Sequence, residues 1–275
     1  MIVEIARAKL NLALHVRARR PDGYHELETL FAFVTDGDVL TVAQTDVPSF
    51  TISGPFASAL AGETDNLVTR ALAAFEAVFG AMPPMAITLE KHLPVASGIG
   101  GGSADAAAML RALARLAGVT DAARLLAIAA DLGSDVPACL FGRTAIGRGR
   151  GEALTPIEGL GGTPTLLVNP GVGVSTRDVF ARWDGVDRGP LGEGALGEVA
   201  RAARNDLQLP AQEVAAVIAE VLSLLEAQRG ATLVRMSGSG ATCFALFEDA
   251  AAMRAASVAI GAVRPGWWRL ETGLA

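Results

Sequence analysis

The segment that offers the most chemistry is a glycine-rich run over residues 94–104, which reads Pro-Val-Ala-Ser-Gly-Ile-Gly-Gly-Gly-Ser-Ala. Glycine lets a backbone approach an oxygen-rich anion closely, and the amides of a helix that starts there point toward the anion. The run therefore predicts a cradle for a phosphate chain, although a plain connector between a strand and a helix has a similar composition. It is not a Walker loop, because no Lys-Ser/Thr pair follows the last glycine. Ser103 occupies the place of the third glycine of a dinucleotide-binding loop, which argues against that pattern too.

A lysine and an aspartate, far apart in the sequence, form a second candidate group. Only Lys9 and Lys91 are lysines, whereas arginine is frequent, so a lysine is informative wherever a compact ammonium is needed. Residues 2–16 alternate as in a strand, which puts Lys9 and Asn11 on one face. Asp135 stands at the predicted start of a helix, where a carboxylate either accepts a proton from an alcohol or caps the helix. Ser134 is an alternative cap, and a solvated strand position is the alternative for Lys9.

Two further segments carry polar or aromatic side chains in turns. Tyr24 is the only tyrosine and precedes His25, and an aromatic face beside a polar edge suits a planar nucleobase. An ordinary surface pair in a turn has the same sequence. Residues 237–240 read Ser-Gly-Ser-Gly, which either supplies amides to an anion or closes a tight hairpin. Asn66 either lines a nucleotide pocket or caps the helix that follows it. The other two histidines, His15 and His92, are expected to be structural.

The bulk composition limits the class of protein. The chain has 275 residues, of which 51% are hydrophobic and 19% charged, as expected for a folded enzyme of two domains. Its net charge of -6 argues against a nucleic-acid partner. No leader sequence and no apolar run of membrane-spanning length is evident, so we expect a soluble cytoplasmic protein without a membrane partner. The spacing of Cys139 and Cys243 indicates neither a metal site nor a disulfide.

Periodicity and turn residues predict the elements that position these groups. Residues 155–163 lack periodicity, so we place the domain boundary there, with domains over 1–160 and 161–275. The predicted elements are a strand over 2–16, two β-rich runs on either side of Asp36-Gly37, a helix from Asp65-Asn66 to about 80, a strand over 85–91, helices over 103–116 and 121–132, a turn over 147–151, a helix over 211–227, a strand over 232–236, a helix over 249–261 and a final strand.

Three motifs together resemble the GHMP kinase superfamily. The run from Pro94 resembles its second motif, Ala-Lys-Leu-Asn-Leu at 8–12 its first and Ser-Gly-Ser-Gly-Ala-Thr-Cys-Phe-Ala at 237–245 its third. They occur in the family order across nearly the whole chain. Gly-Tyr-His-Glu-Leu at 23–27 and Gly-Ser-Asp-Val-Pro at 133–137 resemble the branch that acts on a diphosphocytidyl substrate. Ile99 replaces the usual leucine and Ala104 a frequent second serine, which leaves the backbone cradle unchanged.

The resemblance implies a fold, a reaction and a set of partners. The fold is α+β, with a ribosomal-protein-S5-like N-terminal domain, a ferredoxin-like C-terminal domain and the active site in the cleft between them. The reaction is ATP-dependent phosphorylation of the 2-hydroxyl of the small molecule 4-diphosphocytidyl-2-C-methyl-D-erythritol, with Mg²⁺ bridging the ATP phosphates. The alternatives are another GHMP kinase, such as homoserine or phosphomevalonate kinase, and a nucleotide-binding module without catalysis. The oligomeric state and any protein ligand of the metal are left open.

The resemblance also assigns roles to residues. Lys9 and Asp135 are implied as the catalytic pair, with Asp135 accepting the hydroxyl proton. ATP is implied to bind Asn66, Pro94, Val95, Ala96, Ser97, Gly98, Ile99, Gly100, Gly101, Gly102, Ser103 and Ala104. The diphosphocytidyl substrate is implied to bind Asn11, Tyr24, His25, Thr176, Phe180, Gly238 and Ser239, with the base between the rings of Tyr24 and Phe180.

Overall fold

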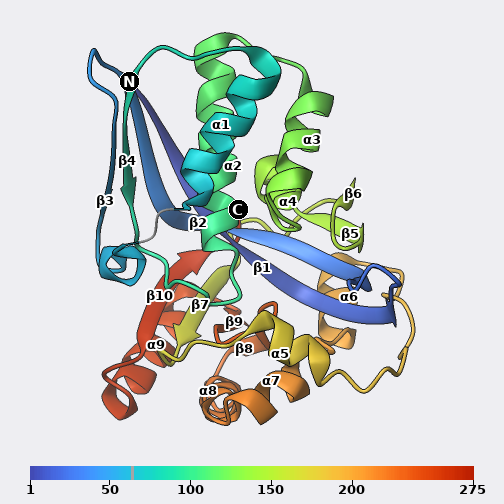
Figure 1. Cartoon of the computed structure of the whole chain (residues 1–275). Coiled ribbons are helices and arrows are strands. Elements are labelled where there is room, and N and C mark those ends of the chain that lie inside the picture. Colours follow the sequence, from blue (N-terminus) through green and yellow to red (C-terminus); the bar gives the residue numbers. More distant parts are fainter. Residues whose placement is uncertain (63–64) are drawn as a thin grey trace. The chain divides into compact units, whose positions relative to one another are not determined.

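The computed structural model describes residues 1–62 and 65–275, which form two compact units interleaved along the chain (Figure 1). Unit 1 comprises Met1–Ala8, Asp36–Val95 and Gly100–Gly142, and unit 2 comprises Lys9–Thr35, Ala96–Ile99 and Arg143–Ala275. Strands β1 (Ile2–Arg19) and β2 (His25–Gln44) pair with each other, and each contributes residues to both units. The single boundary at residue 160 stays a prediction about folding domains, which need not coincide with these interleaved units.

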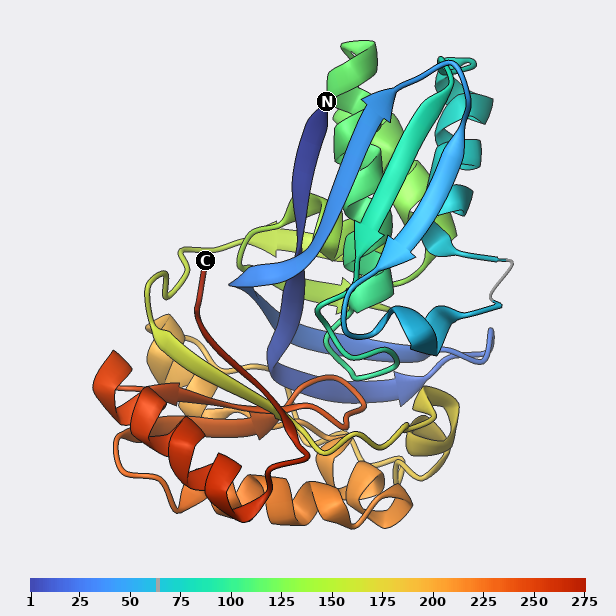
Figure 2. The same ribbon diagram turned by 90° about the vertical axis from the view of Figure 1, so that its left-hand side faces the viewer.

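Unit 1 is a small sheet with helices on one face (Figure 2). The second half of β2 pairs antiparallel with β4 (Met85–Glu90), which pairs parallel with β3 (Ser49–Ser53). Alternate residues of β4 are buried, as the period of a strand with one covered face requires. The helices of this unit are η1 (Ala57–Leu60), α1 (Leu67–Phe79), α2 (Gly101–Ala117), α3 (Ala122–Leu132) and α4 (Val136–Phe141).

Helix α2 is the element that follows the glycine-rich run, and its alanine content explains its place. Most of its side chains are buried, and small side chains let α1 and α4 pack closely around it. The helix begins at Gly101, two residues before the predicted start at Ser103. Gly100 is the N-cap in a left-handed conformation (φ 69°) without a capping side chain, so the last glycines of the run belong to the first turn of the helix.

Unit 2 holds a four-stranded antiparallel sheet in the order β10-β7-β9-β8. Its strands are β7 (Pro164–Asn169), β8 (Ala231–Met236), β9 (Cys243–Phe247) and β10 (Trp268–Gly273). With helices between β7 and β8 and between β9 and β10, the chain order is β-α-β-β-α-β, which confirms the ferredoxin-like prediction. Helices α8 and α9 pack on this sheet. The helices are α5 (Thr176–Ala181), α6 (Leu196–Ala202), α7 (Gln208–Val214), α8 (Val217–Glu226) and α9 (Ala250–Val263).

Unit 2 also contains β5 (Ala145–Gly149) and β6 (Ala153–Pro156), which extend the sheet formed by the first half of β2. The predicted turn over 147–151 is therefore partly wrong, since β5 runs to Gly149. The two predicted β-runs around Asp36-Gly37 are one strand, β2. A Cβ atom at Gly37 would lie 2.0 Å from the carbonyl oxygen of Ala6, so this glycine allows a close approach of two backbones rather than a hairpin turn.

One other predicted element needs correction. The helix expected over 211–227 is two helices, α7 and α8, because Ala215 takes an extended conformation (φ −142°, ψ 90°). Both cysteines are free and buried, in agreement with the prediction of no disulfide. Among the residues that the structure describes, no helix combines the length and the apolar character needed to cross a membrane.

Candidate active site

The buried ammonium of Lys9 is held by an asparagine on the same strand. Its Nζ atom donates to Oδ1 of Asn11 at 2.8 Å, which confirms that the two side chains share a face of β1. Lys9 is only 3% exposed, so the solvated alternative is wrong. Asn11 in turn donates through Nδ2 to Oγ1 of Thr29 at 2.8 Å, and that hydroxyl donates to the carbonyl oxygen of Ala13. This series of hydrogen bonds orients the side-chain amide of Asn11 with its oxygen toward Lys9.

The part of the glycine-rich run that lies in unit 2 is tied to β1 and to the third motif. The backbone amide of Lys9 donates to the carbonyl oxygen of Ile99 at 2.9 Å. The hydroxyl of Ser237 donates to the carbonyl oxygen of Gly98 at 3.0 Å. Gly98 has a φ of +79°, and a Cβ atom there would lie 2.5 Å from the carbonyl oxygen of Ser237. Ala96 takes a φ of +51°, which is strained for a residue with a side chain and is typical of functional loops. Two motifs that are distant in sequence thus meet here.

The third motif is the connection of a β-hairpin. Met236 pairs with Cys243 in the antiparallel pair of β8 and β9, so six residues connect the two strands. Within this connection the amide of Gly240 donates to the carbonyl oxygen of Ser237 at 3.0 Å, so residues 237–240 close a turn as the hairpin alternative predicts. The contact of these residues with an anion stays a prediction.

The side-chain amide of Asn205 donates to the carbonyl oxygens of Met236 and Gly238, both at 2.8 Å. The hydroxyls of Thr176 and Ser239 lie 2.8 Å apart. Sequence reasoning missed Asn205, since no local pattern marks it.

In unit 1, the remaining loop residues form the amino end of α2. The amides of the first turn, from Gly101 to Ser103, have no acceptor within the helix, as at any helix start. Such amides and the helix dipole attract an anion. Asn66 caps α1, because its side chain accepts from the amide of Val68 at 2.9 Å. The capping interpretation of Asn66 is confirmed, and its contact with a nucleotide stays a prediction.

Asp135 lies at the N-cap position of α4, also in unit 1. Its backbone is helical (φ −89°, ψ −15°), and its side chain makes no capping hydrogen bond to the described first turn of the helix. Its carboxylate is therefore not used as a helix cap, and Ser134 does not occupy that position either. Asp135 is half-buried. Its role as the base stays a prediction.

The aromatic residues of the predicted nucleobase site lie in unit 2. The ring of His25 lies against the ring of Phe180, with centroids 4.7 Å apart, and edge-on to Trp183 at 5.6 Å. Burial lowers the pKa of His25, and the nearby Arg19 lowers it further. Tyr24 is half-exposed, with the guanidinium of Arg150 4.9 Å from its ring centroid. Trp183 has no sequence signal and was missed.

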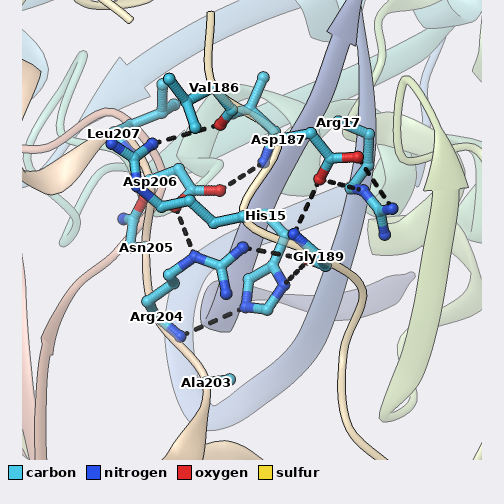
Figure 3. Close-up of polar contacts among 12 residues, drawn as sticks. His15, Arg17, Val186, Asp187, Gly189, Ala203, Arg204, Asn205, Asp206 and Leu207 are labelled. Carbon is cyan, nitrogen blue, oxygen red and sulfur yellow. Dashed lines mark hydrogen bonds and ion pairs between the residues drawn. The ribbon is translucent and has the colours of Figure 1, made fainter. Parts of the chain in front are cut away.

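The segment that follows Trp183 is fixed to β1 by a polar network (Figure 3). The Nδ1 atom of His15 lies 3.0 Å from the carbonyl oxygen of Gly189, and its Nε2 atom accepts from the amide of Arg204 at 3.4 Å. A neutral imidazole can make both bonds. Burial lowers the pKa of His15, and the charge of Arg204 lowers it further, which favours this neutral form. Arg17 pairs with Asp187 at 2.8 Å. His15 is therefore structural, as predicted, and its network positions the connection between α5 and α6.

The described residues contain no group of three or more His, Cys, Asp or Glu side chains arranged to hold a metal ion. Mg²⁺ in kinase sites is commonly bound by substrate phosphates and one or two protein oxygens. The residues present are therefore compatible with a metal carried by a nucleotide, and Ser103, in the first turn of α2, offers one such oxygen.

Comparisons with known proteins agree with the motifs. The family models described as GHMP kinases N terminal domain and GHMP kinases C terminal match residues 66–143 and 190–263. The 4-diphosphocytidyl-2-C-methyl-D-erythritol kinase of Rhizorhabdus wittichii is 54% identical over 98% of this chain and 94% of its own, and that of Sphingopyxis alaskensis is 50% identical over 98% of both.

Solved structures give the same result. A crystal structure of 4-(cytidine 5'-diphospho)-2C-methyl-D-erythritol kinase superposes with a TM-score of 0.84 and 36% identity over 99% of both chains. Homoserine kinase from Cytophaga hutchinsonii, at 17% identity, shares the fold, with a TM-score of 0.72 over 99% of this chain and 94% of its own. The predicted two-domain α+β fold is confirmed. The chain belongs to the 4-diphosphocytidyl-2-C-methyl-D-erythritol kinase family of the GHMP kinase superfamily.

Proposed function

We propose that this chain transfers the γ-phosphoryl group of ATP to the 2-hydroxyl of 4-diphosphocytidyl-2-C-methyl-D-erythritol, a step in the synthesis of isoprenoid precursors. The two relatives that are 54% and 50% identical to it are named as kinases of this compound. The observation that carries the proposal is that unit 2 contains two kinds of side-chain pair. These are the buried pair of Lys9 and Asn11 and the aromatic pair of His25 and Phe180. A substrate with a nucleobase at one end and a reactive alcohol at the other requires both.

ATP binds, in this proposal, with its phosphates on the glycine-rich run. The free amides of the first turn of α2 donate to the phosphate oxygens, and the glycines allow the approach. The hydroxyl of Ser103 would help to hold Mg²⁺ together with the phosphates, and the ion would supply neutralisation of charge on the phosphates.

The chemical step needs a base and a positioned alcohol. Asp135 accepts the proton of the 2-hydroxyl while the hydroxyl oxygen forms a bond to the γ-phosphorus. The bond between that phosphorus and the bridging oxygen breaks, and ADP leaves with the electron pair. The ammonium of Lys9, oriented by Asn11, stabilises negative charge that develops around the reacting oxygens. Asn11 therefore acts both as a binding group and as the support of Lys9.

Recognition of the substrate depends on its cytidine end. The rings of Tyr24 and Phe180 stack on the base, and His25, neutral at pH 7, reads its polar edge. The paired hydroxyls of Thr176 and Ser239 and the amide of Gly238 donate to oxygens of the substrate. Homoserine and phosphomevalonate have no nucleobase, so neither compound would occupy this aromatic site.

The proposal is tested by the product. The purified protein is incubated with ATP, Mg²⁺ and the diphosphocytidyl substrate, and phosphorus NMR follows the new resonance. A phosphomonoester on the 2-hydroxyl, formed in amounts equal to ADP, supports the proposal. Consumption of ATP without that ester, or transfer to another hydroxyl, contradicts it.

A further inference from the structure

A third aromatic ring, that of Trp183, completes the aromatic cluster of unit 2. Trp183 lies two residues beyond the end of α5 and is only 4% exposed. Its ring meets the ring of His25 at a centroid distance of 5.6 Å, with 83° between the planes, and Phe180 meets the same imidazole at 4.7 Å and 30°. The imidazole of His25 therefore packs against two rings in different orientations, which restricts its rotation.

Trp183 is itself fixed in place. Its backbone amide donates to the carbonyl oxygen of Phe180 at 3.2 Å, and its carbonyl oxygen accepts from the guanidinium of Arg19 at 3.5 Å. The same guanidinium donates to the carbonyl oxygen of Ala181 at 3.4 Å. The indole belongs to the hydrophobic core of unit 2. It therefore gives His25 a fixed surface to pack against.

Two ring nitrogens of this contact are buried without a hydrogen-bond partner among the residues that the structure describes. They are Nε2 of His25 and Nε1 of Trp183. Nearly all buried polar groups in proteins are hydrogen-bonded, so each exception needs an explanation, and function is one of them. The Nδ1 atom of His25 is not among these buried atoms, so it is the ring nitrogen that a ligand can reach.

The two unpartnered nitrogens favour one tautomer of neutral His25. The Nε1 atom of Trp183 always carries a hydrogen, so it is a donor only. A hydrogen on Nε2 of His25 would add a second buried donor and supply no acceptor. A charged ring, with hydrogens on both nitrogens, would have the same defect. With the only hydrogen on Nδ1, Nε2 presents a lone pair to a contact that already contains a donor.

We propose that Trp183 is a positioning residue for base recognition, which holds His25 in the tautomer with its hydrogen on Nδ1 and so makes Nδ1 a donor to the pyrimidine. The inference rests on the proposed function in one respect, namely that His25 contacts the cytidine base. The ring nitrogen N3 is an acceptor in cytosine, whereas in uracil it carries a hydrogen. A donor at Nδ1 therefore pairs with cytosine, and with uracil two donors face each other. Trp183 acts through His25 and sets the selectivity for the base.

The first test is NMR of protein labelled with nitrogen-15 in the histidine side chains, which needs no substrate. The two neutral tautomers differ in which nitrogen carries the hydrogen, and the nitrogen shifts distinguish them at about pH 8, where an ordinary imidazole is neutral. The chain has three histidines. His15, whose Nδ1 lies 3.0 Å from the carbonyl oxygen of Gly189, is the internal reference for a hydrogen on Nδ1. The exposed His92 is the reference for an imidazole in water.

Wild-type His25 is expected to match His15. In Trp183→Phe, which keeps an aromatic ring but loses the N–H group, the His25 signals should move toward those of His92. Trp267→Phe, which changes a half-buried indole between α9 and β10, is the matched control and should leave His25 as in the wild type. A wild-type His25 with its hydrogen on Nε2, or a tautomer that persists unchanged in Trp183→Phe, overturns the proposal.

The second test is calorimetric titration with cytidine 5'-diphosphate and with uridine 5'-diphosphate. Wild-type protein should bind the cytidine compound at least about tenfold more tightly, the scale of one mismatched buried donor. Trp183→Phe should reduce this ratio to about threefold or less. A merely structural loss weakens both ligands alike and leaves the ratio of their affinities unchanged. An unchanged ratio in Trp183→Phe therefore overturns the proposal.

A third comparison covers the case in which Trp183→Phe does not fold. His25 is only half-buried, and His25→Asn places an amide nitrogen near the position of Nδ1, whereas His25→Gln places one near that of Nε2. His25→Asn should keep more of the preference for the cytidine compound, and the reverse order overturns the proposal. A protein in which the tautomer of His25 depends on Trp183 as expected, but which binds neither diphosphate, contradicts the proposed function and leaves the control of His25 by Trp183 supported.

Discussion

The imidazole ring of His25 lies against the phenyl ring of Phe180, with 4.7 Å between their centroids and 30° between their planes. His25 begins β2 and Phe180 lies near the end of α5, so the contact depends on the tertiary fold. Because burial lowers the pKa of His25, its ring is neutral at physiological pH. A neutral ring has one donor and one acceptor nitrogen, which suits it to the edge of a base.

The first prediction concerns the pH dependence of substrate binding. A lowered pKa means that His25 gains its proton only below its ordinary value of 6.5. The Michaelis constant for the diphosphocytidyl substrate should therefore be flat from pH 8 to about 6.5 and rise at lower pH, because the charged ring loses its acceptor. Steady-state kinetics of the wild type and of His25→Gln, which cannot titrate, measure this effect. A rise that persists unchanged in His25→Gln assigns it to another group.

Tyr24 gives a second prediction, about specificity. Tyr24→Ala should raise the Michaelis constant for the cytidine-containing substrate about tenfold to a hundredfold, since stacking on an aromatic ring is worth roughly 1–3 kcal/mol per base. The constant for ATP should change little. Because Tyr24 is half-exposed, the melting temperature should also stay nearly constant, and Tyr24→Phe should retain most of the affinity. Weaker ATP binding with normal substrate binding would assign Tyr24 to the adenine site.

The third prediction concerns the base. Asp135→Asn keeps the size of the side chain but cannot take the hydroxyl proton. Turnover should fall by about two to four orders of magnitude, the usual scale for a lost general base, while both substrates still bind. Binding is checked by calorimetry and turnover by ADP release. Near-normal turnover would remove Asp135 from the catalytic step.

A fourth prediction concerns the stability of unit 2. Gly98→Ala places a methyl group 2.5 Å from the carbonyl oxygen of Ser237 at a positive φ, so the backbone must shift. We expect unfolding to become easier by about 1–3 kcal/mol, the usual cost of overpacking. Gly173→Ala is the control, because a Cβ atom there meets nothing within 4 Å. Equal denaturation midpoints for the two variants would show that the contact between Gly98 and Ser237 is absent in solution.

The sequence predicted the features that depend on local patterns. The alternation of β1 placed Lys9 beside Asn11, and the glycines from 100 to 102 led into α2. It did not predict partners that meet only through the fold. Thr29 orients Asn11 from another strand, and Asn205 supports the third motif from a connection between helices.

The dependence on tertiary contacts also explains an error in the predicted secondary structure. Gly37 resembles a turn residue in sequence, yet it serves the close approach of β1 to β2. Lys91 is one of the two lysines of the sequence, but no role was predicted for it, because its partners Asp38 and Asp105 come from separate elements. Only the tertiary structure shows that these three residues meet.

The most direct test of the proposed function compares acceptors at constant ATP and Mg²⁺. Catalytic efficiency, kcat/KM, is measured for 4-diphosphocytidyl-2-C-methyl-D-erythritol, for the same alcohol phosphate without the cytidine group, and for homoserine, mevalonate and galactose. We predict efficient turnover of the first compound and a loss of at least about a hundredfold for the second, because binding energy from the base orients the distant alcohol. Similar efficiency with and without cytidine, or a preference for homoserine or mevalonate, would contradict the assignment of the site in unit 2 to a cytidine-containing substrate.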